Sequence, residues 1–178
     1  MAPPRADPAV RSDAAILTGW YEAHGPAVYR FLRFQVATPD LAEELTAETF
    51  FRACRAAARY RPERAGARSW LVAIARNVLR DHRRRARLRD HLPLPTGGLR
   101  DLVSDAPSPE ERLLREEEVS RLLAAVAALP AGERELIGLR YGSGLEPQEI
   151  AAVLGLRVGT VRSRLWRTLG RLRERLGP

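Results

Sequence analysis

The chain has 178 residues, of which 45% are apolar and 29% charged, enough for one medium-sized domain or two small ones. All thirty basic residues are arginine and the net charge is +8, which predicts a nucleic-acid partner, although a GC-rich genome also favours arginine over lysine. The single cysteine excludes an internal disulfide. The lack of a long apolar run or signal peptide indicates a cytoplasmic protein without a membrane span.

The N-terminal part begins with a proline-rich segment. Residues 1–12 hold three prolines and few large apolar groups, and we expect them to form a disordered arm. From residue 13 to about 36, apolar residues such as Trp20, Val28 and Phe31 recur at helical spacing. The pair Gly25-Pro26 is predicted to bend or break this helix.

Two further helices are predicted before residue 90. Thr38-Pro39-Asp40 carries start signals for a helix that ends near Tyr60. The apolar side of this helix is predicted to consist of Leu41, Leu45, Phe50 and Phe51. Ser69 is the expected N-cap of the next helix, whose apolar residues from Trp70 onward recur at amphipathic spacing.

Residues 91–109 change in character, with four prolines and two adjacent glycines and little periodicity, which predicts a flexible linker. No alternating strand pattern occurs in the sequence. The expected fold class is therefore all-α, with two small helical domains, residues 13–90 and 110–178, joined by the linker.

The second domain is predicted to contain a helix-turn-helix. A helix from Pro109 to Pro130 and a short helix over about 131–140 precede it. Glu146-Pro147 starts the first helix of the motif, and Gly155 ends it as a left-handed C-cap. A second helix then opens at about Gly159 and is expected to enter a DNA major groove.

The predicted recognition helix has one apolar and one polar side. Its core-facing stripe is predicted to be Val161, Leu165, Leu169, Leu172 and Leu176. Residues 157–175 hold seven arginines and one glutamate, a face that repels itself unless an anion neutralises it. Arg167 is placed to bind the edge of a guanine base, and the flanking arginines are placed to bind phosphates. Trp166 either contacts the wall of the groove or caps the core. The DNA-contacting candidates are Thr160, Arg162, Ser163, Arg164, Trp166, Arg167 and Arg171.

Motifs in both halves carry a family resemblance. The segments 40–52 and 70–84 resemble region 2 of bacterial sigma factors. Region 4 is resembled by Leu129-Pro130, the segments 133–135 and 139–141, Glu149-Ile150-Ala151 and the segment 159–165. Both motifs, in this order and with this linker, are similar to the extracytoplasmic-function (ECF) group of sigma factors, which lacks the middle domain.

The resemblance implies two kinds of protein partner. In the family, region 2 docks on the clamp helices of the largest subunit of core RNA polymerase, and region 4 faces the flap of the second-largest subunit. An anti-sigma factor commonly sequesters the free protein. The residues implied for polymerase binding are Asp40, Glu43, Glu44, Leu45, Glu48 and Phe50. Without the resemblance, a solvated acidic face on an ordinary helix is the favoured interpretation.

The resemblance also implies a role for the loop 61–68 and the following helix, namely reading and melting of the −10 promoter element, while the recognition helix reads the −35 element. The residues implied for −10 contact are Arg61, Arg64, Arg68, Arg76, Asn77, Arg80, Arg83 and Arg84. Trp70 is expected to belong to the core. Thr46 departs from the family pattern, because a glutamine usually stands there.

Two other functions compete with a promoter-specificity subunit. One is a conventional helix-turn-helix regulator that acts without core polymerase, as a dimer on a palindromic site. The other is an enzyme that acts on nucleic acid, which requires clustered carboxylates for a metal or a nucleophile with a base. The sequence shows no such cluster, and we predict no catalytic residue, metal or cofactor.

Overall fold

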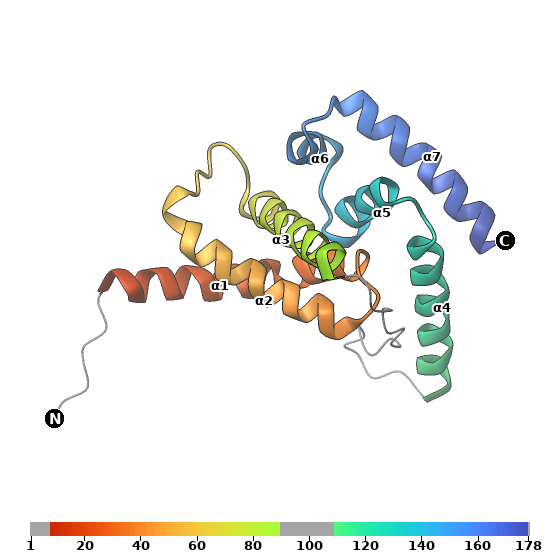
Figure 1. Cartoon of the computed structure of the whole chain (residues 1–178), viewed down its shortest axis with the longest axis horizontal. Coiled ribbons are helices and arrows are strands. Elements are labelled where there is room, and N and C mark those ends of the chain that lie inside the picture. The colour runs from red at the N-terminus through yellow and green to blue at the C-terminus, as the bar shows by residue number, and fades with distance from the viewer. Residues whose placement is uncertain (1–7, 90–108, 178) are drawn as a thin grey trace.

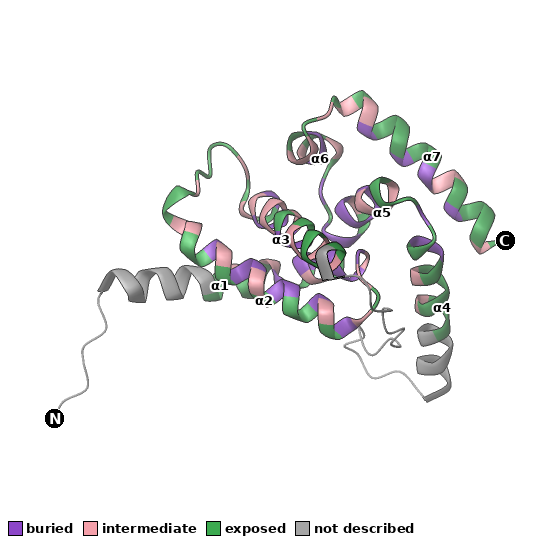
Figure 2. Cartoon of the chain, viewed as in Figure 1, coloured by how far each residue is buried: buried purple, intermediate pink, exposed green. Residues whose placement is uncertain are grey.

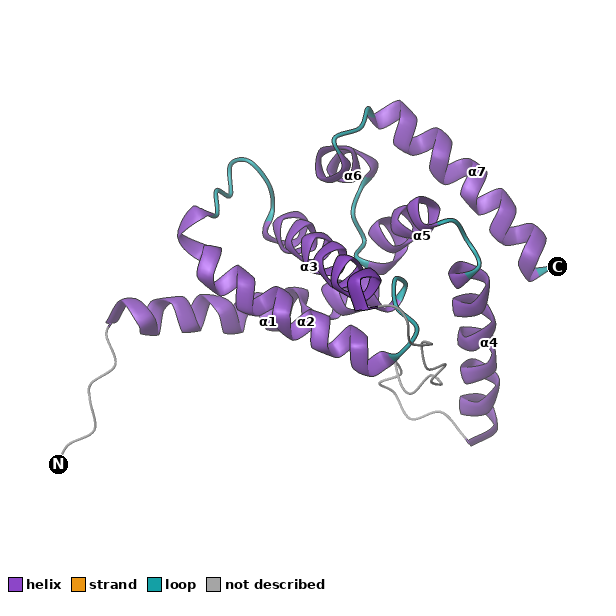
Figure 3. Cartoon of the chain, in the orientation of Figure 1, coloured by secondary structure: helices purple, strands orange, loops and turns teal. Residues whose placement is uncertain are grey.

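The computed structural model describes residues 8–89 and 109–177, and all regular structure within them is helical (Figure 3). The first half contains α1 (Pro8–Arg33), α2 (Pro39–Ala56), the short 3-10 helix η1 (Ala57–Arg59) and α3 (Ala67–Arg89). The second half contains α4 (Pro109–Ala127), α5 (Ala131–Ile137), the π-helical segment η2 (Gly138–Gly142), α6 (Pro147–Leu154) and α7 (Val158–Leu176). In these two ranges no helix is long and apolar enough to cross a membrane.

Helix α1 corrects two expectations from the sequence. It begins at Pro8, so residues 8–12 are helical and are not part of a disordered arm; residues 1–7 lie outside the described part. It also continues through Pro26 without a break. A proline inside a helix costs about 3 kcal/mol, whereas each fully buried large apolar side chain contributes about 1.5–3 kcal/mol. Val28, Phe31 and Leu32 are fully buried just beyond the proline, and their packing outweighs its cost.

Helices α1, α2 and α3 pack against one another to form the core of the first half (Figure 1). Thr38 caps α2, as its hydroxyl accepts a hydrogen bond from the backbone N–H of Leu41 at 3.3 Å. Ser69 does not cap α3, contrary to expectation, because α3 begins two residues earlier and Ser69 is buried in its first turn. The hydroxyl of Ser69 instead donates to Glu149 of the second half at 2.5 Å.

The second half contains the predicted helix-turn-helix, formed by α6 and α7. A capping box joins Glu146 and Glu149 at the start of α6, and Gly155 ends the helix at φ +66°. Val161, Leu165 and Leu172 of the predicted stripe are buried and the other two are half-buried. Thr168, which the sequence did not single out, is buried as well, and its hydroxyl donates to the carbonyl of Arg164 at 2.9 Å.

The two halves pack directly on each other, which the sequence did not predict. Segment η2 lies against α1, and the buried apolar residues of both halves belong to one cluster. Figure 2 shows which parts of each helix are buried. The connection expected over 91–109 falls, up to residue 108, outside the described residues. The two helical regions expected from the sequence are present, but their buried residues form one shared core.

The αL cap at Gly155 can be tested with Gly155→Ala. A side chain at φ +66° is strained, so the variant should lose about 1 kcal/mol of stability. Gly170→Ala is the matched control, because Gly170 lies inside α7 with open space at its Cβ position, and this variant should gain about 0.5–1 kcal/mol. Urea unfolding of both variants measures the difference, and equal stabilities would contradict the assigned cap.

Candidate nucleic-acid and polymerase interfaces

Helix α7 presents an arginine-rich surface on the side away from the core. Trp166 is 77% exposed, so it does not cap the core, the alternative that the sequence left open. Of the other predicted DNA-contacting residues, Thr160 is half-buried and the rest are exposed: Arg162, Ser163, Arg164, Arg167 and Arg171. The surface thus combines cations, a hydroxyl and one large aromatic ring.

A hollow of about 340 Å³ lies between α5 and α7, and it contains three of these arginines, Arg164, Arg167 and Arg171. Arg171 forms an ion pair with Glu133 of α5, whose side chain is 23% exposed. The Nε of Arg167 donates to the carbonyl of Ser163 at 3.3 Å, one turn back along α7. Arg171 is therefore partly neutralised within the protein, whereas Arg167 has no acidic partner among the described residues.

Helix α3 carries a second basic surface, here named the α3 arginine face. It consists of Arg76, Arg80, Arg83, Arg84 and Arg87. These residues line a hollow of about 570 Å³, together with Leu79 and Glu135 of α5. Burial, and secondarily the nearby Arg134, lowers the pKa of Arg83, which as an arginine still stays charged. Asn77 is exposed on α3 but does not line this hollow.

The loop that precedes α3 is anchored by three aromatic rings. Trp20, Tyr60 and Trp70 have their ring centroids 5.1–5.2 Å apart in all three pairings. The two pairs that Trp20 forms are edge-to-face, and such pairs contribute about 0.5–1.5 kcal/mol each beyond their burial. Arg61, Arg64 and Arg68 are exposed on the loop and at the start of α3. The aromatic cluster thus holds the ends of a loop whose cations face solvent, and Trp70 is half-buried against the core as expected.

Helix α2 carries the predicted acidic surface, with one correction. Asp40, Glu43 and Glu44 are exposed and Glu48 is half-buried. Leu45 and Phe50, however, are only 3% and 8% exposed and belong to the core, so they offer little surface to a partner, although Leu45 is among the residues that line a hollow between α2 and α3. Phe51 is 59% exposed instead, beside a hollow of about 400 Å³ between α2 and α3.

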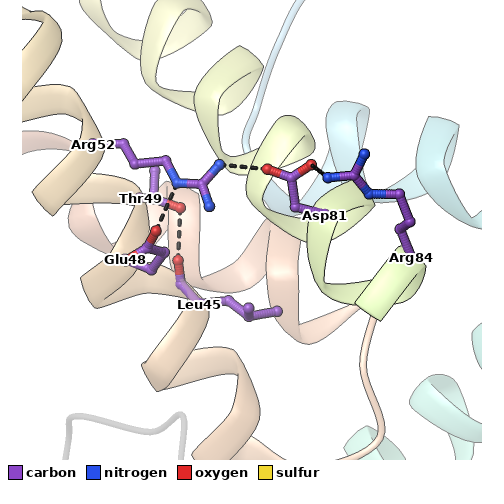
Figure 4. Close-up of polar contacts among 6 residues, drawn as sticks. All are labelled: Leu45, Glu48, Thr49, Arg52, Asp81 and Arg84. Carbon is purple, nitrogen blue, oxygen red and sulfur yellow. Dashed lines mark hydrogen bonds and ion pairs between the residues drawn. The ribbon is translucent and has the colours of Figure 1, made fainter. Parts of the chain in front are cut away.

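An ion-pair network connects this surface to α3 (Figure 4). Arg52 bonds Glu48 on its own helix and Asp81 on α3, both at 2.6 Å, and Asp81 lies 3.6 Å from Arg84. The hydrogen bond from Arg52 lowers the pKa of Asp81, and the bonds to Asp81 and Glu48 raise that of Arg52. The network therefore fixes the position of the acidic surface of α2 relative to the α3 arginine face.

Three residues of these surfaces escaped the reasoning from sequence. Phe51 and Phe50 are neighbours, and only packing decides which of them faces the core. Arg87 follows Arg83 by one helical turn, so the spacing of the arginines was an available signal. Glu135 carries no such signal, because its contact with Arg76 joins residues 59 positions apart.

Comparisons with known proteins agree with this architecture. Residues 20–89 match the Sigma-70 region 2 family and residues 120–172 match Sigma-70 region 4. The ECF RNA polymerase sigma factor BldN of Streptomyces coelicolor is 36% identical over 155 residues, which cover 85% of this chain but only 58% of BldN. SigC of Mycobacterium tuberculosis, also an ECF RNA polymerase sigma factor, is 34% identical over 160 residues, 89% of this chain and 82% of SigC.

Solved structures show the same fold. The sigma factor RpoE, in complex with the anti-sigma factor NepR from Bartonella quintana, matches with a TM-score of 0.72 and 24% identity, covering 89% of this chain and 95% of RpoE. CnrH, in complex with the cytosolic domain of CnrY, matches with a TM-score of 0.62 and 25% identity, over 88% and 84% of the two chains. The two helical regions and their arginine surfaces agree with the matched regions 2 and 4 and with these relatives. The chain therefore belongs to the family of ECF RNA polymerase sigma factors.

Proposed function

We propose that this chain is a promoter-specificity subunit, which joins core RNA polymerase in the cytoplasm, reads a −35 element with α7 and opens the −10 element with the loop 61–68 and α3. It performs no chemistry of its own. The observation that carries the proposal is the pair of separate basic surfaces, one on each half of a chain that matches region 2 and region 4. A conventional regulator needs only one such surface for each subunit.

The −35 assignment is supported by the exposed face of α7. A recognition helix reads base edges with its N-terminal part and grips phosphates with its flanks. Arg167 has no acidic partner among the described residues, so it is free to donate two hydrogen bonds to a guanine. Arg162 and Arg164 are exposed beside it and suit the phosphates.

The −10 assignment is supported by the α3 arginine face and the loop before it. A separated DNA strand needs a cationic track for its backbone, and the energy of backbone contacts offsets the unstacking of its bases. Arg80 and Arg84 are exposed along this track, and Arg61 and Arg64 extend it onto the loop. These cations are thus carried by one helix and by the loop before it.

The polymerase-binding surface is assigned to the exposed side of α2. Interfaces commonly surround an aromatic side chain with charged residues, which stay at the wetter rim. Phe51 is the exposed aromatic residue here, and Glu44, Glu48 and Arg52 line the same hollow. We propose that this surface binds the clamp helices of the largest polymerase subunit and that the second half binds the flap of the second-largest subunit. An anti-sigma factor is proposed as the inhibitor that competes with polymerase for these surfaces.

The proposed function as a whole is tested by run-off transcription. Purified full-length chain, core polymerase and a library of native upstream fragments should give defined transcripts that core polymerase alone does not make. Sequencing their 5′ ends identifies the promoters. If no fragment is transcribed with inhibitor-free protein, the proposal is wrong.

The polymerase surface is tested by comparing two substitutions on α2. Phe51→Asp places a charge at an exposed site, so the fold should survive while affinity for core polymerase falls about tenfold or more. Leu45→Asp buries a charge in the core and should cost more than about 3 kcal/mol of stability. Ala124→Asp, on the exposed side of α4, adds the same charge elsewhere and serves as control. Pull-down and thermal unfolding separate the effects; a Phe51→Asp variant with unchanged affinity would exclude this surface.

The role of Arg167 is tested by promoter competition with the assembled holoenzyme. Arg167→Ala should remove about 1–3 kcal/mol of discrimination between the cognate −35 sequence and one with a replaced guanine. Arg162→Ala should instead weaken binding to all sequences alike and flatten the salt dependence. Arg175→Ala, near the end of α7, is the charge-matched control. Undiminished preference for the cognate sequence after Arg167→Ala would refute the base contact.

A further inference from the structure

The hollow between α5 and α7 brings a carboxylate to one flank of the recognition helix. Three arginines of α7 line it: Arg164, Arg167 and Arg171. Glu133 of α5 is the only acid among the described residues that line this hollow. It forms an ion pair with Arg171, and the side chains of Glu133 and Arg171 are 23% and 50% exposed. One cation of the proposed DNA surface is therefore engaged within the protein.

The position of Glu133 is fixed by the start of its own helix. Glu133 lies in the first turn of α5, where the helix dipole favours a carboxylate. Its backbone N–H donates to the carbonyl of Pro130 at 2.9 Å, and Arg134 donates to the carbonyl of Leu129 at 3.2 Å. The turn that carries the carboxylate is thus held by hydrogen bonds, whereas Arg171 is a long side chain on the exposed side of α7. Arg171 is therefore the partner that has to move if the ion pair is to open.

The burial of Glu133 determines whether Arg171 can leave it for DNA. The second carboxylate oxygen, Oε2, is buried and has no hydrogen-bond partner among the described residues. If Arg171 moved to a phosphate, a mostly buried carboxylate would lose its cation, and an unpaired buried charge is strongly destabilising. A phosphate offers Arg171 the same kind of charge-assisted hydrogen bond that the carboxylate already provides. The exchange therefore gains little at the DNA and destabilises the protein.

We propose that Glu133 is a positioning residue that keeps Arg171 off the DNA backbone, so that α7 makes one phosphate contact fewer than its arginines would allow. This inference rests on the proposed function, which makes α7 a DNA-reading helix. Phosphate contacts strengthen binding to every sequence alike, whereas base contacts distinguish sequences. Glu133 thus lowers the affinity of α7 for DNA in general and leaves the choice of sequence to base-reading residues such as Arg167.

The salt dependence of DNA binding measures this role. Log affinity falls with log salt concentration with a slope of about −0.9 for each phosphate that the protein neutralises. The measurement uses the full-length chain and a fluorescein-labelled 20-bp duplex of mixed sequence, between about 50 and 200 mM salt. Glu133→Gln frees Arg171 and should steepen the slope by about 0.9, so that its gain in affinity is about threefold larger at the lower salt concentration.

A double variant shows whether Arg171 is the cation that Glu133→Gln releases. Glu133→Gln/Arg171→Ala removes both partners and should return the slope to that of the unchanged chain. If Arg171 already binds a phosphate in the unchanged chain, the double variant will instead have a slope shallower by about 0.9. Glu44→Gln, at an exposed position of α2 in the other half, makes the same change of net charge and should leave the slope unchanged, because a distant surface charge is screened. Circular dichroism verifies that all variants are folded.

The side chain of Arg171 is observed independently by NMR of the full-length chain. Its Nε–H signal is identified by its loss in Arg171→Ala. Addition of the duplex should leave this signal in place in the unchanged chain and shift it in Glu133→Gln. Shifts of equal size in the two proteins would overturn the proposal.

The outcomes separate this inference from the proposed function. A steeper slope in Glu133→Gln that the double variant abolishes supports the role of Glu133. An unchanged slope in Glu133→Gln, or a double variant that differs from the unchanged chain, overturns it. Arg162→Ala removes an exposed cation of α7 and should flatten the slope by about 0.9. If neither Arg162→Ala nor Glu133→Gln changes the slope, the −35 assignment fails as well, whereas an effect of Arg162→Ala alone overturns only this inference.

Discussion

The arrangement of the whole chain depends on the close approach of η2 to α1. Two glycines, Gly138 and Gly142, contribute no side chain of their own, so the backbone of η2 packs directly against residues 31–35 of the first half. The approach merges the two small cores into one cluster of buried residues. It also determines which faces remain open, because α5 and α6 are thereby placed over the first turns of α3.

The excess of arginine over acidic residues leaves many cations exposed on the packed helices. With thirty arginines against 22 acidic residues, the chain cannot neutralise its own cations, and the few acids that contact them are informative. Glu48 and Asp81 hold Arg52 between α2 and α3, Glu133 holds Arg171 on the recognition helix, and Glu135 holds Arg76. Other arginines, such as Arg167, Arg64 and Arg80, face solvent on α7, on the loop before α3 and along α3 itself, where promoter DNA is proposed to lie.

The helices and the helix-turn-helix were predictable because local signals specify them: the cap at Thr38, the capping box at Glu146 and the αL turn at Gly155. The stripe of α7 followed from its spacing. The prediction of a break at Pro26 was wrong, because the burial of side chains just beyond it outweighed the local preference of proline. Packing between distant segments decides that Phe50 is buried and Phe51 exposed, and it creates the contacts of Glu135 and Ser69. No local sequence pattern carries this information.

The central claim, that two halves which close on each other when free must separate to act at a promoter, is tested most directly by locking them together. In a Cys54→Ser background, Arg30→Cys and Tyr141→Cys place exposed thiols on α1 and η2 at their contact, where a reducible bismaleimide can join them. We predict that the cross-linked chain supports no run-off transcription with core polymerase and regains it on reduction. Full activity of the cross-linked chain would contradict the account.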